Sequence, residues 1–174
     1  ATYQAFNLPA SVRPLLPSDL DGPTLPPAGA ANIFATIAPT NSITLRKFHV
    51  DWNTPANTTL SAPITLTVAA FSDVVSYVDQ PGSPFSLDSL SDRPMYRLAY
   101  RNFGGGDERM VVNHAVMVNN TKKPNSGNAA VRWYEIRSVG TAPYIAQQSS
   151  YSPDTTFRWM GSVAQDKQGN MALG

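Results

Sequence analysis

The chain contains no cysteine, few charged residues and no long apolar run. Without cysteine it cannot form a disulfide, a thiolate metal site or a thiol nucleophile. Charged residues make up only 14% of its 174 residues, against roughly 25% in an average globular domain. The net charge is +1 and the basic residues do not cluster, which argues against a nucleic-acid partner. No apolar run approaches the roughly 18 residues of a membrane-spanning helix, so we expect no membrane span.

Proline and glycine are abundant instead, with 15 and 11 copies, and they favour short strands joined by turns over long helices. Apolar and polar residues alternate over residues 43–51 and 64–71, which is the period of a half-buried strand. We therefore predict an all-β fold of antiparallel sheets. The expected strands cover residues 43–51, 64–71, 95–102, 110–118, 130–137, 144–148 and 157–164, and a last arm begins at Asn170.

The first 31 residues differ from the remainder of the chain because they hold six prolines. We expect an extended, irregular arm here. Apolar residues such as Phe6 and Leu15 indicate that this arm packs against another part of the protein, since a solvated linker would be more polar. Residues 32–174 form the predicted β-sheet region. Within it, residues 72–92 are expected to be a long loop and residues 103–107 a hairpin turn.

The last residues predict a second hairpin. In the segment Asp-Lys-Gln-Gly-Asn, Asp166 can accept backbone N–H bonds across the turn, while Gly169 and Asn170 tolerate positive φ. The sequence then stops on the second hairpin arm. We therefore expect the chain to be a fragment of a larger β-propeller, completed by other segments of the same protein or by a companion chain.

Six runs of sequence carry a family resemblance: residues 48–57, 92–103, 111–114, 131–137, 151–154 and 158–162. Together they resemble a family of large secreted bacterial proteins with propeller-like folds and unassigned function. The segment from Asp166 to Gly174 is also similar to a bacterial propeller repeat, although three residues separate Asn170 from Gly174 where that repeat usually has four. The resemblance implies a propeller-like fold and an extracellular bacterial location, and it implies no particular reaction.

Four arginines in or beside the predicted strands are candidate ligand-binding residues: Arg97, Arg101, Arg132 and Arg158. Guanidinium groups that converge at a propeller centre could bind the carboxylates of acidic sugars in a bidentate manner. The alternative is structural, because arginines commonly pair with Asp or Glu and cover apolar strands with their stems. The alternative is the simpler interpretation.

The sequence offers three further candidate catalytic groups: a histidine, a tyrosine and a glutamate. His114 lies in an apolar strand and, with Tyr96 or Tyr134, could supply the base and acid of a polysaccharide lyase. A buried neutral histidine bonded to the backbone is the competing interpretation. Glu135 is a lone acid in a strand, whereas glycoside hydrolysis normally requires two carboxylates, and no spacing in the sequence selects a partner.

Asp166, Gln168 and Asn170 alternate in one loop and could offer oxygen atoms to Ca²⁺, although a full calcium loop usually has more acidic ligands. No other cofactor is expected, because the sequence has no phosphate-binding or dinucleotide-binding motif, and it has no catalytic triad motif.

The sequence thus predicts a secreted propeller-like protein with a binding or structural role and leaves open whether it is an enzyme. One alternative is a carbohydrate-active enzyme, either a glycoside hydrolase or a polysaccharide lyase, acting on a polysaccharide at the propeller centre. Another is a self-assembling extracellular surface or filament subunit. An enzyme would bring the arginines, His114 and Glu135 to one cavity, whereas a binding module would expose aromatic residues such as Trp133 and Trp159.

Overall fold

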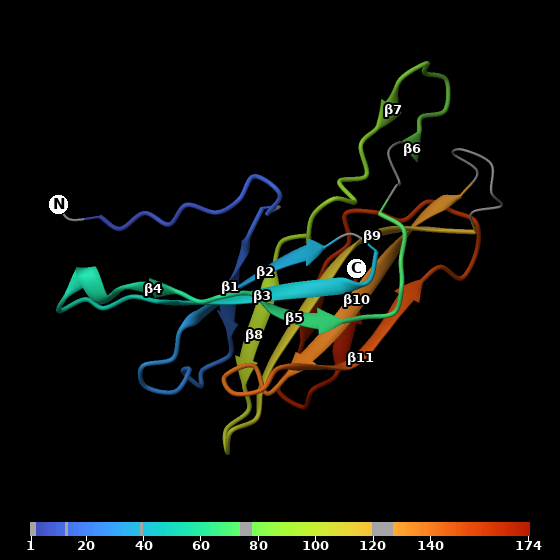
Figure 1. Ribbon diagram of the computed structural model, residues 1–174. Coiled ribbons are helices and arrows are strands. Elements are labelled where there is room, and N and C mark those ends of the chain that lie inside the picture. Colours follow the sequence, from blue (N-terminus) through green and yellow to red (C-terminus); the bar gives the residue numbers. More distant parts are fainter. Residues whose placement is uncertain (1–2, 13, 39, 74–77, 120–126) are drawn as a thin grey trace.

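A computed structural model describes residues 3–12, 14–38, 40–73, 78–119 and 127–174. In this part of the chain the fold is all-β, with one short 3₁₀ turn (Figure 1). The strands are β1 (Leu16–Asp21), β2 (Asn32–Ala38), β3 (Ser42–His49), β4 (Thr59–Leu60), β5 (Ile64–Thr67), β6 (Val78–Asp79), β7 (Ser86–Leu87), β8 (Leu98–Asn102), β9 (Glu108–Val118), β10 (Asn128–Arg137), β11 (Tyr144–Tyr151), β12 (Val163–Gln165) and β13 (Met171–Leu173), and η1 (Pro55–Asn57) is the 3₁₀ turn.

Nine of these strands form one curled, half-barrel sheet in the order β11-β10-β9-β8-β1-β2-β3-β4, with β5 also pairing with β3. All neighbours are antiparallel except β1 and β8. The β6–β7 hairpin projects upward from the sheet in Figure 1, while the N-terminal segment and the β3–β4 hairpin extend to the left.

Strand β1 joins the two halves of the sheet. Leu16 and Pro17 pair with β2, and Ser18–Asp21 then pair with β8 in parallel. This strand was not expected, because the prolines around it predict an irregular arm over residues 1–31. Pro17 is tolerated in the strand because it lies where the chain leaves one partner and joins the other, where a missing N–H costs least. The sheet therefore begins within the arm, ahead of residue 32.

Most of the other strands lie where the sequence predicts them. β3, β5, β8, β9, β10 and β11 overlap the expected ranges, and the glycine-rich turn between β8 and β9 is closed by a bond from the Phe103 N–H to the Asp107 carbonyl (2.8 Å). The strand expected at 157–164 is reduced to β12. In its first half the Arg158 N–H donates to the Ala129 carbonyl (2.8 Å), so that this segment crosses the start of β10 and forms no strand of its own.

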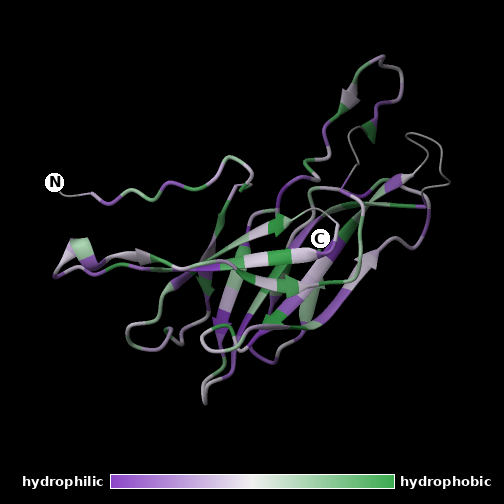
Figure 2. Cartoon of the chain, viewed as in Figure 1, coloured by the Kyte–Doolittle hydropathy of each residue, from purple (hydrophilic) through white to green (hydrophobic). Residues whose placement is uncertain are grey.

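The main core lies inside the curl of the sheet. Alternate residues of β2 and β3, such as Ile33 and Leu45, meet alternate residues of β8 to β10, such as Leu98, Met110 and Ile136. All five side chains are at most 4% exposed. Figure 2 shows the same pattern as hydrophobic residues that recur along the strands of the sheet. Burial of these side chains is the main term that stabilises the fold.

A second, smaller core lies on the outer face of the sheet. The β12–β13 hairpin packs there, with Val163, Met171 and Leu173 against Ala99 of β8 and Val111 of β9. Strands β8 and β9 are thus covered on both faces, which explains why they are buried almost continuously. The β12–β13 hairpin forms a separate two-stranded sheet in the described part of the chain.

The two far edges of the curled sheet are connected by side chains. Gln148 of β11 accepts a hydrogen bond from the Ala69 N–H just after β5 (3.0 Å), and Arg132 donates to both Gln148 (2.6 Å) and the Ala69 carbonyl (3.4 Å). Within the described ranges, none of the helical turns is long and apolar enough to cross a membrane.

Candidate functional site

His114 and Tyr134 form a stacked pair inside the main core. The two residues lie on the neighbouring strands β9 and β10, where His114 is paired with Arg132. Their rings are nearly parallel, 8° apart with centroids 5.6 Å from each other, and the His114 Nε2 lies 2.9 Å from the Tyr134 hydroxyl. Phe71 packs edge-on against the other side of the imidazole at 4.8 Å. Tyr96, the alternative partner expected from the sequence, is 76% exposed and lies outside this cluster.

The environment of His114 holds it neutral. Burial and the positive charge of Arg132 lower its pKa to about 3, and burial raises the pKa of Tyr134 to about 12. Nδ1 is buried beside the backbone of Ala115, whose interaction with the imidazole opposes the lowering of the pKa without outweighing it. A general base works best with a pKa near the working pH. His114 therefore has the properties of a core residue, which is the second of the two interpretations that the sequence allows.

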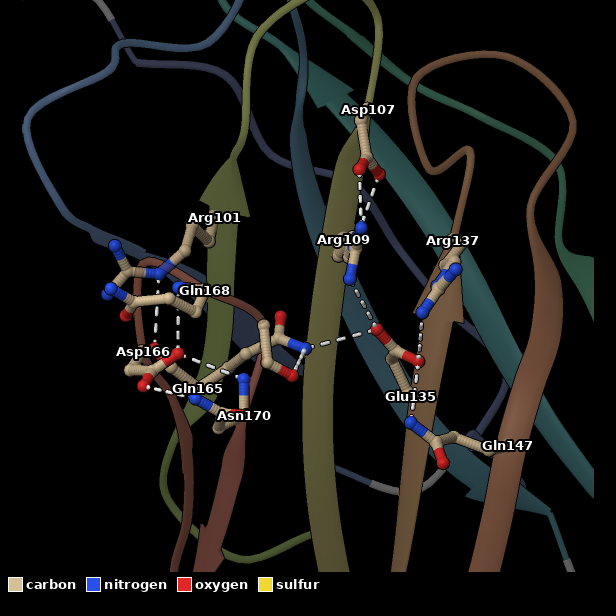
Figure 3. Close-up of polar contacts among 11 residues, drawn as sticks. Arg101, Asp107, Arg109, Glu135, Arg137, Gln147, Gln165, Asp166, Gln168 and Asn170 are labelled. Atoms are coloured by element: carbon tan, nitrogen blue, oxygen red, sulfur yellow. Dashed lines mark hydrogen bonds and ion pairs between the residues drawn. The ribbon is translucent and has the colours of Figure 1, made fainter.

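Glu135 lies on the opposite face of β10, under the β12–β13 hairpin, and is completely buried (Figure 3). Four side chains donate to its carboxylate. One oxygen accepts from Arg109 (3.3 Å) and Gln165 (3.1 Å), and the other accepts from Arg137 (3.1 Å) and Gln147 (3.0 Å). Both oxygens thus have two donors, and the carboxylate links β9, β10, β11 and the hairpin.

The same contacts set the ionisation of Glu135. Burial alone would raise the pKa of this carboxyl, but hydrogen bonds from Arg137, Gln165 and Gln147 outweigh burial and lower the pKa below its usual value. The four donors occupy the lone pairs of this carboxylate, and its burial keeps a substrate away from it. Glu135 therefore cannot act as an acid or a nucleophile. Sequence reasoning did not find Arg109, Gln147 and Gln165, because they come from three separate strands with no shared spacing.

Two of the four candidate arginines hold β8 to its neighbours. Arg97, just before β8, makes ion pairs with Asp19 (3.0 Å) and Asp21 (2.5 Å) of β1. Arg101, near the other end of β8, donates to the backbone carbonyl of Gln165 in β12 (3.1 Å). These contacts tie β8 to its parallel partner on one side and to the hairpin on the other.

The other two arginines have partners elsewhere. Arg132 lies on the inner face and donates to Gln148 and to the Ser150 hydroxyl (3.2 Å). Arg158 lies in the segment before β12 and makes a bidentate pair with Asp154 (2.7 and 2.9 Å). The structure therefore brings Arg132 together with His114, while Arg158 lies with a different set of neighbours.

Asp166, Gln168 and Asn170 form the tight turn between β12 and β13 (Figure 3). One Asp166 carboxylate oxygen accepts from the backbone N–H groups of Gln168 (2.8 Å) and Asn170 (2.9 Å), and the other accepts from the Asn170 side chain (2.9 Å). Gly169 has a φ of +87°, as the turn chemistry predicts. In the ranges that the structure describes, no three His, Asp or Glu side chains gather closely enough to hold a metal ion.

A groove of about 350 Å³ opens where the segment before β12 crosses the sheet. The residues that line it include Val131 of β10, three aromatic residues and Arg158, the aromatic ones being Tyr151, Phe157 and Trp159. Tyr151 is 53% exposed, while the other two rings are half-buried. The Arg158 guanidinium lies over the Tyr151 ring at 5.5 Å. Trp133, the other tryptophan expected at a binding face, is half-buried and does not line this groove.

Comparison of the chain with protein-family models, with curated proteins and with solved structures gave no match.

Proposed function

We propose that this chain is part of a secreted, propeller-like bacterial protein with a binding role, and that the groove around Trp159 takes a neutral saccharide. The observation that carries the binding role is the groove itself, with three aromatic rings around one opening. Ligand pockets are typically lined by aromatic and apolar groups with a few polar ones, and groove volumes of about 300–1,000 Å³ are usual.

The charge balance of the groove favours a neutral sugar over an acidic one. Arg158 is the cation at its rim, but both of its terminal nitrogens already bond to Asp154, and one also donates to the Thr156 carbonyl (3.1 Å). A uronic or sialic acid would have to displace Asp154. A neutral sugar ring can instead place its C–H face on the rings of Trp159 or Tyr151, which present large apolar surfaces with polar edges.

The propeller-like architecture remains part of this proposal. Strands β8 to β11 form a four-stranded antiparallel meander, which is the usual form of a propeller blade. The β12–β13 hairpin packs on the outer face of that meander, where the next blade of a propeller would lie. Two-stranded sheets are only marginally stable alone. We propose that further strands, from the same protein or from a companion chain, pair with β13.

The test of the binding role is a titration with neutral oligosaccharides, such as cello-, xylo- and malto-oligosaccharides, followed by tryptophan fluorescence and calorimetry. Trp159→Ala should abolish saturable binding. Trp52→Ala is the matched control, since Trp52 is 87% exposed at the far β3–β4 hairpin and should be dispensable. Folded protein that binds none of the sugars, or binding that survives Trp159→Ala, would refute the assignment.

The same incubations distinguish the carbohydrate-active enzyme. Release of shorter sugars, lost in Glu135→Gln or His114→Gln while the variant keeps its fold, would favour a glycosidase or lyase. The binding proposal expects intact sugars after prolonged incubation, because both residues are enclosed in the protein interior.

A further inference from the structure

A second cavity, of about 460 Å³, lies at the opposite end of the sheet from the β6–β7 hairpin. The loop between β1 and β2, residues 26–31, forms one wall of this cavity and supplies prolines and alanines. The polar residues that line the cavity include Lys47 of β3, Tyr100 of β8 and Glu108 of β9. Its volume is in the usual range for a small-molecule site, and apolar walls with a few convergent polar groups are the usual composition.

Glu108 is the unusual member of this set. The residue is more than nine-tenths buried, with 8% of its surface exposed. Of its two carboxylate oxygens, only one accepts a hydrogen bond among the described residues, from the Tyr100 hydroxyl at 2.5 Å. Burial and the neighbouring carboxylate raise the pKa of Tyr100, so its hydroxyl remains protonated and donates. Among the described residues no cation pairs with Glu108. Buried carboxylates are ordinarily paired with a cation, as Glu135 is.

Lys47 also lines the cavity, but its ammonium group bonds to a partner other than Glu108. Its ammonium group donates to the Gly140 carbonyl (2.7 Å), and Gly140 in turn lies against Glu108, since a Cβ there would be 2.2 Å from the carboxylate. Both charged groups thus lie against Gly140. An ammonium group has three N–H donors, and a single acceptor for Lys47 leaves the others available for a ligand.

From this arrangement we infer that the cavity binds a small protonated amine that also carries oxygen acceptors, as amino sugars and amino acids do. The amine pairs with Glu108, the oxygen acceptors bond to Lys47, and the apolar part of the ligand packs on Pro26 and Pro27. A simple cation without acceptors is disfavoured, because Lys47 would repel it. This site is separate from the groove around Trp159, so either site can fail a test without the other.

The test uses glucosamine as the probe, with N-acetylglucosamine as its uncharged counterpart. Backbone amide shifts in ¹H–¹⁵N spectra should move for residues 28–33 and for Gly140 and Thr141 as glucosamine is added. N-acetylglucosamine should leave those shifts unchanged, because acetylation removes the charge. n-Butylamine, which has the charge without the acceptors, should bind more weakly than glucosamine.

Glu108→Gln should weaken glucosamine binding roughly tenfold or more, the usual effect of losing a charge-assisted bond. Asp154→Asn, at an exposed carboxylate beside the other groove, should bind as the parent does. If Glu108→Gln does not fold, the comparison of glucosamine with N-acetylglucosamine on the parent protein still tests whether the cavity recognises the protonated amine. Equal binding of the two sugars, amide shifts confined to other regions, or no shifts with glucosamine would each overturn the assignment.

Discussion

His114 and Glu135 lie on the adjoining strands β9 and β10, yet their side chains occupy opposite faces of the sheet. The register pairs His114 with Arg132 and Glu135 with Val111, and side chains alternate along each strand. His114 therefore enters the main core, while Glu135 faces the β12–β13 hairpin. The two groups cannot act together on one substrate, and each stabilises a different packing interface.

The buried histidine predicts a pH dependence of stability. Its folded pKa of about 3 lies below the ordinary value of 6.5, so the unfolded chain takes up a proton first as the pH falls. Stability attributable to His114 is thus complete above pH 6.5 and decreases below it, by about 2 kcal/mol at pH 5. Urea unfolding at several pH values between 7.5 and 5 measures this slope.

The control for that slope is His114→Gln. The variant loses ring packing and should be less stable at every pH, but its unfolding free energy should vary much less between pH 6.5 and pH 5. The other histidine, His49, is exposed and is present in both proteins, so it contributes equally to the two pH profiles. Parallel pH profiles for parent and variant would show that His114 already titrates normally in the folded state.

Asp166 predicts local order in the β12–β13 hairpin. One oxygen of its carboxylate accepts two backbone N–H bonds that close the turn, and Asp166→Ala removes both bonds. Amide hydrogen exchange should accelerate in Val163–Gln165 and Met171–Leu173 and stay unchanged in the centre of β9 and β10. Asp154→Ala is the matched control, since it removes a similar turn acceptor at Thr156 outside the hairpin. Unchanged exchange in the hairpin would mean that the turn holds without Asp166.

Gly140 predicts a steric limit beside the second cavity. A Cβ at this position would lie 2.2 Å from a Glu108 oxygen, so Gly140→Ala should destabilise the protein by about 1–3 kcal/mol, the usual cost of overpacking. The cost should shrink when Glu108→Ala is present too, because the clashing group is then gone. A double-mutant cycle by urea unfolding measures this coupling. If the destabilising effects of Gly140→Ala and Glu108→Ala were additive, the strain caused by the added Cβ would not come from its contact with Glu108.

Much of the fold is predictable from the sequence because its local rules are strong. Alternation marks β3 and β5, and glycine-rich or Asp-x-x-Gly-Asn segments mark both tight hairpins. Strand β1 was missed because its prolines argue against a strand, and only its position between two partners makes it possible. The curl of the sheet depends on that parallel pairing with β8, which no local pattern encodes.

The candidate sites were less predictable. The sequence offers His114, Glu135 and the arginines as isolated polar residues in strands, and the choice between chemistry and structure depends on what surrounds them. Four donors from separate strands meet at Glu135, and that convergence follows from the register of β9 to β11 and from the packing of the β12–β13 hairpin on the sheet. No sequence pattern predicts Glu108 as a site residue, because its burial depends on the loop between β1 and β2.

The buried polar residues hold the layers of sheet together, and Glu135→Gln is the variant that tests this role. The variant keeps the size of the side chain but removes the charge that two arginines share, Arg109 and Arg137. Loss of one partner in a buried charged network typically costs about 3–5 kcal/mol. Asp154→Asn, which removes an exposed carboxylate paired with Arg158, is the matched control and should have little effect.

The measurement is the free energy of unfolding of Glu135→Gln by urea at neutral pH, with amide exchange of β12 and β13 recorded on the same protein. A structural role for Glu135 predicts that the free energy of unfolding falls by about 3–5 kcal/mol, together with faster exchange in the hairpin. Unchanged stability and unchanged exchange would refute this structural role, and would mean that Glu135 does not hold the hairpin to the sheet.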